Sequence, residues 1–366
     1  MKLYLDGLFY KGSGIGRYYE SLTKEFAKRG IKIYTCVYKN LKTDFERDFA
    51  GINNIEPIFV DYEKFSIKGF LKQPKILRKL EHDVDLFFYP HINLPYYIPK
   101  NTIVTIHDLI PLTHFWGRNK VKREIFLFYL KRAIKHSAQI ITISNTVANE
   151  LRKNFKRINK EIKVICRFID EKFMQDYELN KPLIKHPYLL YIGNRKKHKN
   201  LEILIKAFSK IQNEIPHYLV IAGAKESDKD DIDVMVEKLD LKSRVIELIR
   251  PSDETIINLY TFADLFIFPS LFEGFGLPPL EAVSLGCPVI LSDIPVLREI
   301  FGEAGLYFNP HNEEDLAKTI LRVILDKNFR DKLLQNQRNR LKIFDKEKII
   351  DEYVELFDKI RLRGSL

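Results

Sequence analysis

The sequence predicts two α/β domains, each a doubly wound, Rossmann-like parallel sheet, facing one another across a cleft. Short apolar strands alternate with amphipathic helices through both halves of the chain. At 366 residues the chain is long enough to build two hydrophobic cores. The alternation loosens once, over residues 170–187, where the sequence is polar and carries Pro182 and Pro187. Ligands of such sheets bind at the carboxyl ends of the strands.

In the first half, the glycine-rich stretch from Gly12 to Gly16 is expected to form a loop, with a helix behind it that runs to Lys28. Tyr18, Leu22 and Phe26 repeat at helical spacing within that helix. Two further helices are expected at residues 119–136 and 146–155. Strands are expected at residues 2–6, 31–37, 85–89, 102–106, 139–143 and 162–166.

The second half repeats the alternation, and its tail from residue 313 onward is helical and charged. Strands are expected at residues 188–193, 217–223, 244–248, 264–268 and 288–292, and helices at 200–214, 231–239, 253–262 and 277–285. The domains are therefore expected to span residues 1–175 and 184–345. A C-terminal helix at 346–366 can return to the first domain.

Composition excludes a disordered or membrane-spanning chain. Hydrophobic residues make up 45% and charged residues 30%, and no apolar run approaches the roughly 20 residues that span a bilayer. The three cysteines, Cys36, Cys166 and Cys287, are scattered, as in a reducing compartment. The start reaches Asp6 before a signal-peptide core could form. A cytoplasmic protein is expected.

The net positive charge of the chain is confined to the first half. Residues 1–180 hold 32 Lys+Arg against 20 Asp+Glu, whereas residues 181–366 hold 28 against 29. That half is expected to face an anionic membrane, a phosphorylated acceptor or nucleic acid. The stretches 64–80 and 118–136 interleave apolar with basic residues and could lie on anionic lipid. Core helices with solvated charged faces remain the alternative, and Trp116 is either an interfacial anchor or a packed side chain.

The most informative stretch runs from the strand at 264–268 to Glu281. Two glycines, Gly274 and Gly276, leave the loop open to a ligand, and a helix with prolines in its first turn follows. Such a helix N-terminus attracts anions. Glu273 and Glu281 bracket the turn, and carboxylates beside an anion site are suited to hydroxyl groups. A sugar nucleotide is a ligand with both a diphosphate and hydroxyl groups. The structural alternative is that this segment is an ordinary strand–turn–helix unit without a ligand.

Three other stretches are candidate ligand contacts. His107 ends an apolar strand and precedes Asp108, a site-like position, although a lone histidine is more often structural. The segment from Gly193 to Lys199 is densely cationic and suits a leaving diphosphate, or is a solvated turn. The glycines at 12, 14 and 16 do not match the dinucleotide pattern, but they allow backbone approach to a diphosphate unless they form only a flexible turn.

The segment Phe-Pro-Ser-Leu-Phe-Glu-Gly-Phe-Gly-Leu-Pro-Pro-Leu-Glu-Ala resembles the signature of retaining glycosyltransferases of family 4, which have the GT-B fold. The resemblance implies that Glu281 binds the ribose, that Glu273 binds the sugar and that Lys199 binds the diphosphate. His107 would point at the donor sugar. The implied donor-binding set also includes Gly274, Phe275, Gly276, Leu277, Gly14 and Gly16. No metal and no cofactor beyond the donor is implied.

The chain departs from the family pattern at two places. Asn194 stands where the family has arginine, with Arg195 one place late as a possible substitute. Asp170 matches, but Arg167 and Phe168 replace the family's Asn-Gly.

Three further stretches have modest expected roles. Ser144 resembles a family serine and is explained nearly as well as a helix cap. Residues 247–251 would lie under the base through backbone atoms. The Asp228-Lys-Asp230 segment is interpreted as solvated surface rather than a metal site.

The leading hypothesis is a retaining, metal-independent hexosyltransferase. It would move a sugar from GDP-mannose or a UDP-sugar to a glycan or lipid-linked acceptor of surface polysaccharide, at the inner face of the membrane. Two alternatives remain open: a sugar-nucleotide epimerase or hydrolase of the same fold, and a non-catalytic basic module that binds membrane or nucleic acid. No recognisable nucleic-acid motif appears, so a nucleic-acid partner is not expected.

Overall fold

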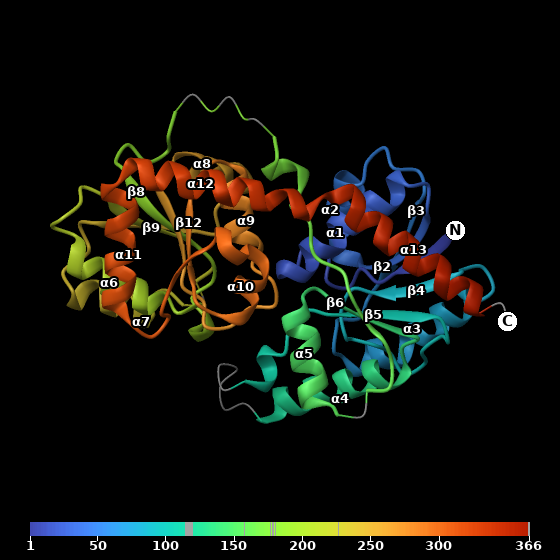
Figure 1. Cartoon of the computed structure of the whole chain (residues 1–366). Coiled ribbons are helices and arrows are strands. Elements are labelled where there is room, and N and C mark those ends of the chain that lie inside the picture. Colours follow the sequence, from blue (N-terminus) through green and yellow to red (C-terminus); the bar gives the residue numbers. More distant parts are fainter. Residues whose placement is uncertain are drawn as a thin grey trace. The chain divides into compact units, whose positions relative to one another are not determined.

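The chain folds into two compact units in a computed structural model (Figure 1). The structure describes residues 1–113, 120–156, 158–175, 177, 179, 181–225 and 227–364. Unit 1 comprises Met1–Arg167 together with Lys346–Leu366, and unit 2 comprises Phe168–Asp345. The chain therefore changes unit at residue 168, earlier than the expected linker at 170–187, which belongs to unit 2. Trp116 and the expected helix start at residue 119 lie outside the described residues.

Unit 1 is built on a seven-stranded parallel sheet in the order β3-β2-β1-β4-β5-β6-β7. β1 lies between β2 and β4, and Leu3 is aligned with Ile33 on one side and Leu86 on the other. Strand order therefore reverses direction beside β1. The strands are β1 (Lys2–Leu5), β2 (Lys32–Tyr38), β3 (Ile55–Val60), β4 (Leu86–Tyr89), β5 (Thr102–Ile106), β6 (Gln139–Thr142) and β7 (Ile162–Val164).

The sequence analysis identified six of these strands but omitted β3. β3 is an edge strand with Pro57 in its middle and a half-exposed face, so it lacks the continuous apolar run of the central strands. β4 and β5, by contrast, are buried at every position.

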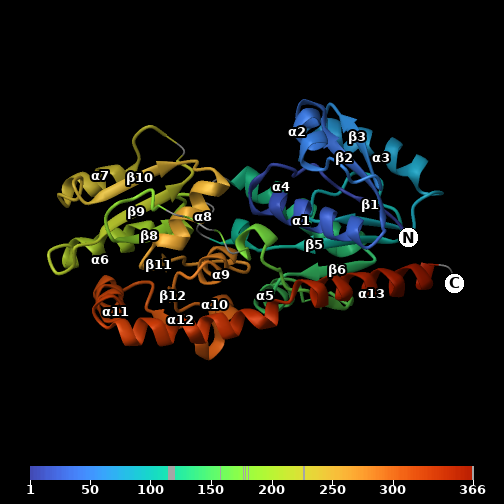
Figure 2. The ribbon, with the colours of Figure 1, turned by 90° about the horizontal axis from the view of Figure 1, so that it is seen from above.

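The helices of unit 1 include one from the far end of the chain. They are α1 (Ser13–Lys28), α2 (Lys42–Asp48), α3 (Ile67–Leu80), α4 (Lys120–His136), α5 (Asn145–Asn154) and α13 (Lys346–Gly364). α13 runs along the strands of unit 1 (Figures 1 and 2). Its Tyr353 is fully buried, with ring contacts to Phe26 and Phe88, and the salt bridge from Arg29 to Glu347 is 2.6 Å long.

The expected glycine loop at residues 12–16 is wrong in its extent. α1 begins at Ser13, so Gly14 and Gly16 lie in its first turn and only Gly12 precedes it, at the N-cap position. The helix starts early because the Gly16 N–H already donates to the Gly12 carbonyl at 2.7 Å.

Unit 2 carries a six-stranded parallel sheet in the order β10-β9-β8-β11-β12-β13. Strand order reverses between β8 and β11, which are direct neighbours. The strands are β8 (Tyr188–Ile192), β9 (Tyr218–Gly223), β10 (Val245–Ile249), β11 (Leu265–Phe268), β12 (Val289–Ser292) and β13 (Leu306–Phe308). β13 was not predicted, because three residues are too few to show a period.

The helices of unit 2 are α6 (Leu201–Ile211), α7 (Asp231–Lys238), α8 (Asp253–Phe262), α9 (Leu277–Ser284), α10 (Pro295–Phe301), α11 (Glu313–Leu325) and α12 (Lys327–Leu341). α10 was also missed. The core of this unit lies between the sheet and helices such as α6 and α11, whose apolar faces include Phe208 and Ile320. Within the described part of the chain, no helix combines the length and the apolar character needed to cross a membrane.

Candidate functional site

The loops after β8 and β11 meet at the point where the strand order of unit 2 reverses. The Leu271 N–H donates to the His198 carbonyl at 2.7 Å, which ties the two loops together. Lys199 on the first loop and Glu273 on the second form an ion pair, with 2.6 Å between Nζ and Oε1. Doubly wound sheets bind their ligands at this switch point. Two predicted site residues are therefore brought into contact there.

The ion pair is largely buried. The Lys199 side chain is 16% exposed and the Glu273 side chain 11% exposed, and the ammonium lies 5.4 Å from the centre of the Phe268 ring. Asn200, in the left-handed conformation at φ 54°, ends the short turn that carries Lys199 and starts α6. The lysine is therefore held by the fold rather than left on a flexible surface arm. A fixed cation of this kind can stabilise negative charge that develops on a leaving group.

Gly276 is required where α9 begins. Its φ is +96°, and a Cβ atom there would lie 2.9 Å from Leu297 Cδ2. Phe275 is buried, with its ring 5.7 Å from that of Phe344, and Leu277 is also buried. Among residues 275–277, ligand contacts would therefore come mainly from backbone groups. α9 starts with Pro residues and no acidic residue in its first turn, as suits an anion at its N-terminus.

Glu281 lies inside α9 and is only 2% exposed. Its carbonyl accepts hydrogen bonds from the Leu285 N–H at 3.2 Å and from the Ser284 hydroxyl at 2.8 Å. The low exposure means that Glu281 can contact only a group that reaches into the unit, such as a hydroxyl of a bound ligand.

Arg195 is occupied by carboxylates. Its guanidinium is 2.8 Å from Asp233, 3.1 Å from Asp230 and 2.9 Å from Glu247, and its side chain is 5% exposed. Burial opposes ionisation of Asp233, yet hydrogen bonds from Lys225 and Arg195 hold its pKa well below the usual value. That Arg195 replaces the family arginine remains a prediction, and this placement speaks against it.

Asn194 also serves its own loop. Its side-chain oxygen accepts from the Lys196 N–H at 3.2 Å, and its carbonyl accepts from the Tyr191 hydroxyl at 2.7 Å. These contacts stabilise the turn after β8 that carries Lys199.

In unit 1, His107 follows β5 and is fixed in one tautomer. Its Nε2 lies 2.8 Å from the Pro90 carbonyl, which can only accept, so Nε2 carries the proton and Nδ1 has a free lone pair. Burial and the nearby charge of Arg167 lower the pKa of His107 to about 3. The imidazole is therefore neutral near pH 7 and can accept a hydrogen bond from a hydroxyl.

Gly14 and Gly16 differ in what surrounds them. A Cβ on Gly16 would lie 2.5 Å from the Phe9 carbonyl oxygen, so this glycine is explained by packing. A Cβ on Gly14 would meet only the Arg167 guanidinium, at 3.8 Å. Arg167 also stacks on Tyr18 at 5.4 Å, and the Tyr18 ring meets His107 edge-on at 4.8 Å. The backbone of Gly14 is thus open beside a cation.

Arg167 is a candidate functional residue that the sequence analysis noted only as a departure. It gathers with His107 and Gly14 at the carboxyl end of the unit 1 sheet. A signal was present, because Arg167 follows β7 by three residues and stands where the family pattern has Asn-Gly. Sequence order alone did not place it beside residues that precede it by more than fifty positions.

Three other expected residues accept hydrogen bonds from nearby backbone N–H groups. The Asp108 carboxylate accepts from the Ile110 N–H at 2.9 Å, and the Ser144 hydroxyl accepts from the Val147 N–H at 3.2 Å. Asp230 caps α7 in a capping box with Asp233. Asp228 is exposed. Among the described residues, no three metal-ligating side chains cluster.

Comparison with known proteins identifies the family. Residues 174–340 match the model of glycosyl transferases group 1, and residues 12–173 match the model of glycosyltransferase family 4. The chain therefore carries a glycosyltransferase family 4 domain followed by a glycosyl transferases group 1 domain, and its two parallel-sheet units are those of the GT-B fold. The predicted fold class and family are confirmed.

Two relatives and one solved structure illustrate the similarity. The chain is 31% identical over 222 residues to the O-antigen chain mannosyltransferase RfbU of Salmonella typhimurium, and the match spans 60% of each chain. It is 25% identical over 289 residues to a Campylobacter jejuni enzyme, N-acetylgalactosamine-N,N'-diacetylbacillosaminyl-diphospho-undecaprenol 4-alpha-N-acetylgalactosaminyltransferase, covering 76% of this chain and 77% of that one. The sucrose-phosphate synthase structure from Thermosynechococcus elongatus matches with a TM-score of 0.80 at 19% identity, covering 100% of both chains.

Proposed function

We propose that the protein is a retaining glycosyltransferase that moves a sugar from a nucleoside-diphosphate sugar to a lipid-linked glycan of surface polysaccharide. The observation that carries the proposal is the buried Lys199–Glu273 ion pair at the strand-order switch of unit 2, beside the start of α9. A nucleoside-diphosphate sugar has an anionic part for the lysine and the helix N-terminus, and hydroxyls for the acids.

Each group then has a defined task. Lys199 binds the diphosphate, Glu281 the ribose hydroxyls, and Glu273 the sugar hydroxyls. The bond between the anomeric carbon and the diphosphate oxygen breaks, and the electron pair leaves on the diphosphate. An acceptor hydroxyl forms the new bond on the same face, and its proton passes to a diphosphate oxygen. Lys199 and the backbone amides that lead into α9, from Gly274 to Leu277, stabilise the developing charge, so the step requires no metal.

The donor sugar and the acceptor are inferred from the relatives. RfbU is an O-antigen chain mannosyltransferase, which favours GDP-mannose as the first donor to test. The Campylobacter jejuni relative is named for a diphospho-undecaprenol acceptor, which favours a lipid-linked glycan. We infer that the protein works in the cytoplasm, at the inner face of the membrane.

A thermal-shift panel of GDP-, UDP- and ADP-sugars tests the donor, because a ligand that binds only the folded state raises the melting temperature. We expect GDP-mannose to give the largest shift, with an acceptor-dependent product whose anomeric configuration is that of the donor. An inverted product would contradict the retaining mechanism. Rapid conversion of the donor without acceptor would instead identify an epimerase or hydrolase.

A further inference from the structure

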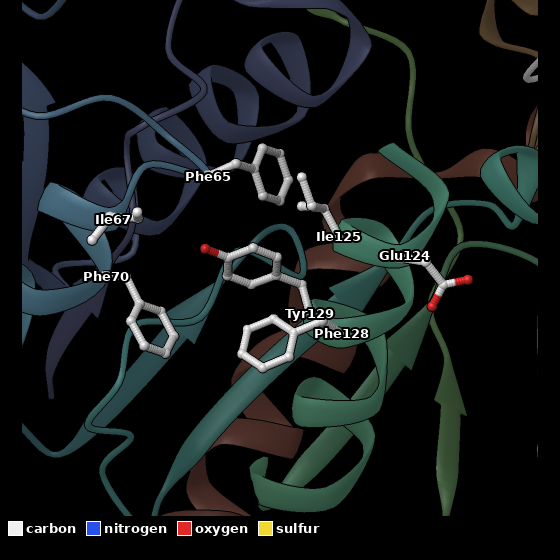
Figure 3. Close-up of a pocket in the computed structure, with 7 residues that line it drawn as sticks. All are labelled: Phe65, Ile67, Phe70, Glu124, Ile125, Phe128 and Tyr129. Atoms are coloured by element: carbon white, nitrogen blue, oxygen red, sulfur yellow. The ribbon is translucent and has the colours of Figure 1, made fainter. Parts of the chain in front are cut away.

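An apolar groove lies in unit 1 between the start of α3 and α4. It encloses about 430 Å³ and is lined by Phe65, Ile67, Phe70, Ile125, Phe128 and Tyr129. Figure 3 shows the rings of Phe65, Phe70, Phe128 and Tyr129 gathered around it, while the Glu124 carboxylate at its edge points away. This volume falls in the range of small-molecule sites.

The groove is walled by side chains that a protein would ordinarily bury. Ile67 is 80% exposed, Phe128 is 48% exposed and Phe65 is 40% exposed, whereas Tyr129 closes the floor and is buried. Leu71, one turn after Ile67 in α3, is also exposed. An exposed apolar patch of this kind marks a surface that binds something apolar.

Phe65 is held at the groove in an unfavourable backbone conformation. Its φ is +57°, in the left-handed region that a bulky residue rarely adopts. Its N–H donates to the Asn93 side-chain oxygen at 2.9 Å, which fixes the conformation. Strain of this kind persists where the surroundings impose it, and it is common at ligand sites.

Lys64, a half-buried lysine, contacts the ring of Phe9, which in turn packs against Phe65 of the groove. The Lys64 ammonium lies 4.3 Å from the centre of the Phe9 ring, and Phe9 meets Phe65 edge-on at 6.0 Å. Within the described ranges, no carboxylate lies at salt-bridge distance from this ammonium. Burial lowers the pKa of Lys64. An anion bound beside the Lys64 ammonium would offset the cost of burying its charge.

Neighbouring cations of the groove are already engaged. Lys68 is 2.7 Å from Asp61, and Lys72 is 3.7 Å from the same carboxylate. Arg132 stacks over Phe70 at 5.1 Å and donates to the Pro95 carbonyl at 2.8 Å. Lys64 is therefore better placed than these three to receive a ligand anion.

The groove is connected to the candidate site of unit 1. The Phe9 and His91 rings are tilted against each other with their centres 4.4 Å apart, and His91 directly follows Pro90, whose carbonyl accepts from His107. A Cβ on Gly12, at the start of α1, would lie 3.3 Å from the Lys64 ammonium. A ligand with its chain in the groove and its anion on Lys64 would direct its remaining part toward the carboxyl end of the sheet.

We propose that this groove binds the hydrocarbon chain of a prenyl-diphosphate-linked acceptor and that Lys64 binds its phosphate. The proposal rests on the proposed function and gives the lipid acceptor a location. A prenyl chain with an anionic head matches both parts of the surface: the aromatic groove and the adjacent Lys64 ammonium.

Farnesyl diphosphate, a soluble prenyl diphosphate, is the probe, and its affinity for the full chain is measured by titration calorimetry. Ile67→Glu together with Ile125→Glu places two negative charges on exposed groove positions, so we expect at least tenfold weaker binding. Lys64→Gln should weaken farnesyl diphosphate about fivefold and leave farnesol unchanged, whereas Lys64→Arg should keep the affinity. The matched controls are Leu325→Glu, an exposed apolar position of unit 2, and Lys79→Gln on α3.

Three results would overturn the inference. The groove variants could bind farnesyl diphosphate as tightly as the wild type, or inorganic diphosphate could bind the wild type as tightly as farnesyl diphosphate does. The groove variants could also lose their binding to anionic vesicles without prenyl lipid to the same extent as their binding to farnesyl diphosphate. The donor panel separates the two proposals. If GDP-mannose shifts melting but the groove variants bind the probe normally, only the groove assignment fails. If the groove variants lose the probe but no nucleotide sugar shifts melting, the groove stands as a prenyl-phosphate site and the proposed function fails.

Discussion

Lys199 and Glu273 carry opposite charges in a largely buried place, and their pairing fixes both side chains before a donor binds. The geometry suits catalysis because a preorganised cation needs little rearrangement as negative charge develops. Glu273 is held by the same contact, with 2.6 Å between the charged atoms.

Replacing Lys199 by Met should lower kcat about 10²- to 10³-fold, because the leaving diphosphate loses its fixed cation. Lys199→Arg retains the charge and should lose less. Steady-state kinetics with the donor identified by the thermal-shift panel measure both. Near-full turnover by Lys199→Met would remove this residue from the mechanism.

His107 should make stability depend on pH. Its pKa of about 3 lies below the roughly 6.5 of an unfolded histidine, so the unfolded chain takes up the proton first as pH falls. The stabilisation is complete above pH 6.5 and is lost toward pH 3, by at most about 1.4 kcal/mol per pH unit.

The matched variant is His107→Gln, which cannot titrate. Urea unfolding at pH 7, 6 and 5 should show the free-energy difference between wild type and variant shrinking as pH falls. Burial and the charge of Lys199 lower the pKa of His198 to about 4. His198 is present in both proteins, so its contribution cancels in the difference. A difference that stays constant from pH 7 to pH 5 would refute the assignment.

At the scale of elements, the start of α1 contains two glycines with different reasons to be there. Gly16→Ala should destabilise the protein by about 1–3 kcal/mol, because its Cβ would lie 2.5 Å from the Phe9 carbonyl oxygen. Gly14→Ala has room and should stabilise by about 0.4–1 kcal/mol. Chemical denaturation of both variants measures this contrast.

Activity then distinguishes packing from ligand contact at α1. If the Gly14 backbone approaches the donor, Gly14→Ala should be more stable and yet less active. If Gly14→Ala gains stability and keeps full activity, the glycine affects only the stability of α1 and does not contact a ligand.

Arg195 joins the loop after β8 to the start of α7 and to β10 through its three carboxylate partners. Arg195→Met should destabilise unit 2 by about 2 kcal/mol or more, because Asp230, Asp233 and Glu247 would lose their shared cation. The donor KM should change less than about threefold. A large rise in KM with unchanged urea unfolding would instead restore Arg195 as a diphosphate ligand.

For the whole molecule, the net positive charge belongs to unit 1. Unit 1 holds 36 Lys+Arg against 21 Asp+Glu, and unit 2 holds 24 against 28, which together give the net charge of +11. Vesicles with anionic lipid should therefore bind the protein at low salt and release it as salt rises, since exposed charges are screened. Co-sedimentation at 50 and 500 mM salt measures this, with neutral vesicles as the control. Equal binding to neutral vesicles would contradict the electrostatic account.

Much of the fold was readable because apolar runs and helical periods are local properties. β5 and α8 have the bounds that were expected, and β11 was displaced by one residue. The elements that were missed, β3, α2, α10 and β13, are short or lie at edges, where burial on one side only leaves a weak pattern. The family signature at Glu273 and Glu281 was equally local.

By itself, the sequence determined the family, the two parallel sheets and the residue types available at the strand ends. Only the tertiary structure decided which of those residues meet: that Lys199 pairs with Glu273, that carboxylates occupy Arg195, and that Lys64 stands beside an apolar groove. The physical reason is that side-chain contacts depend on which strand ends become neighbours. That order is set by the packing of whole helices and sheets, not by distance along the chain.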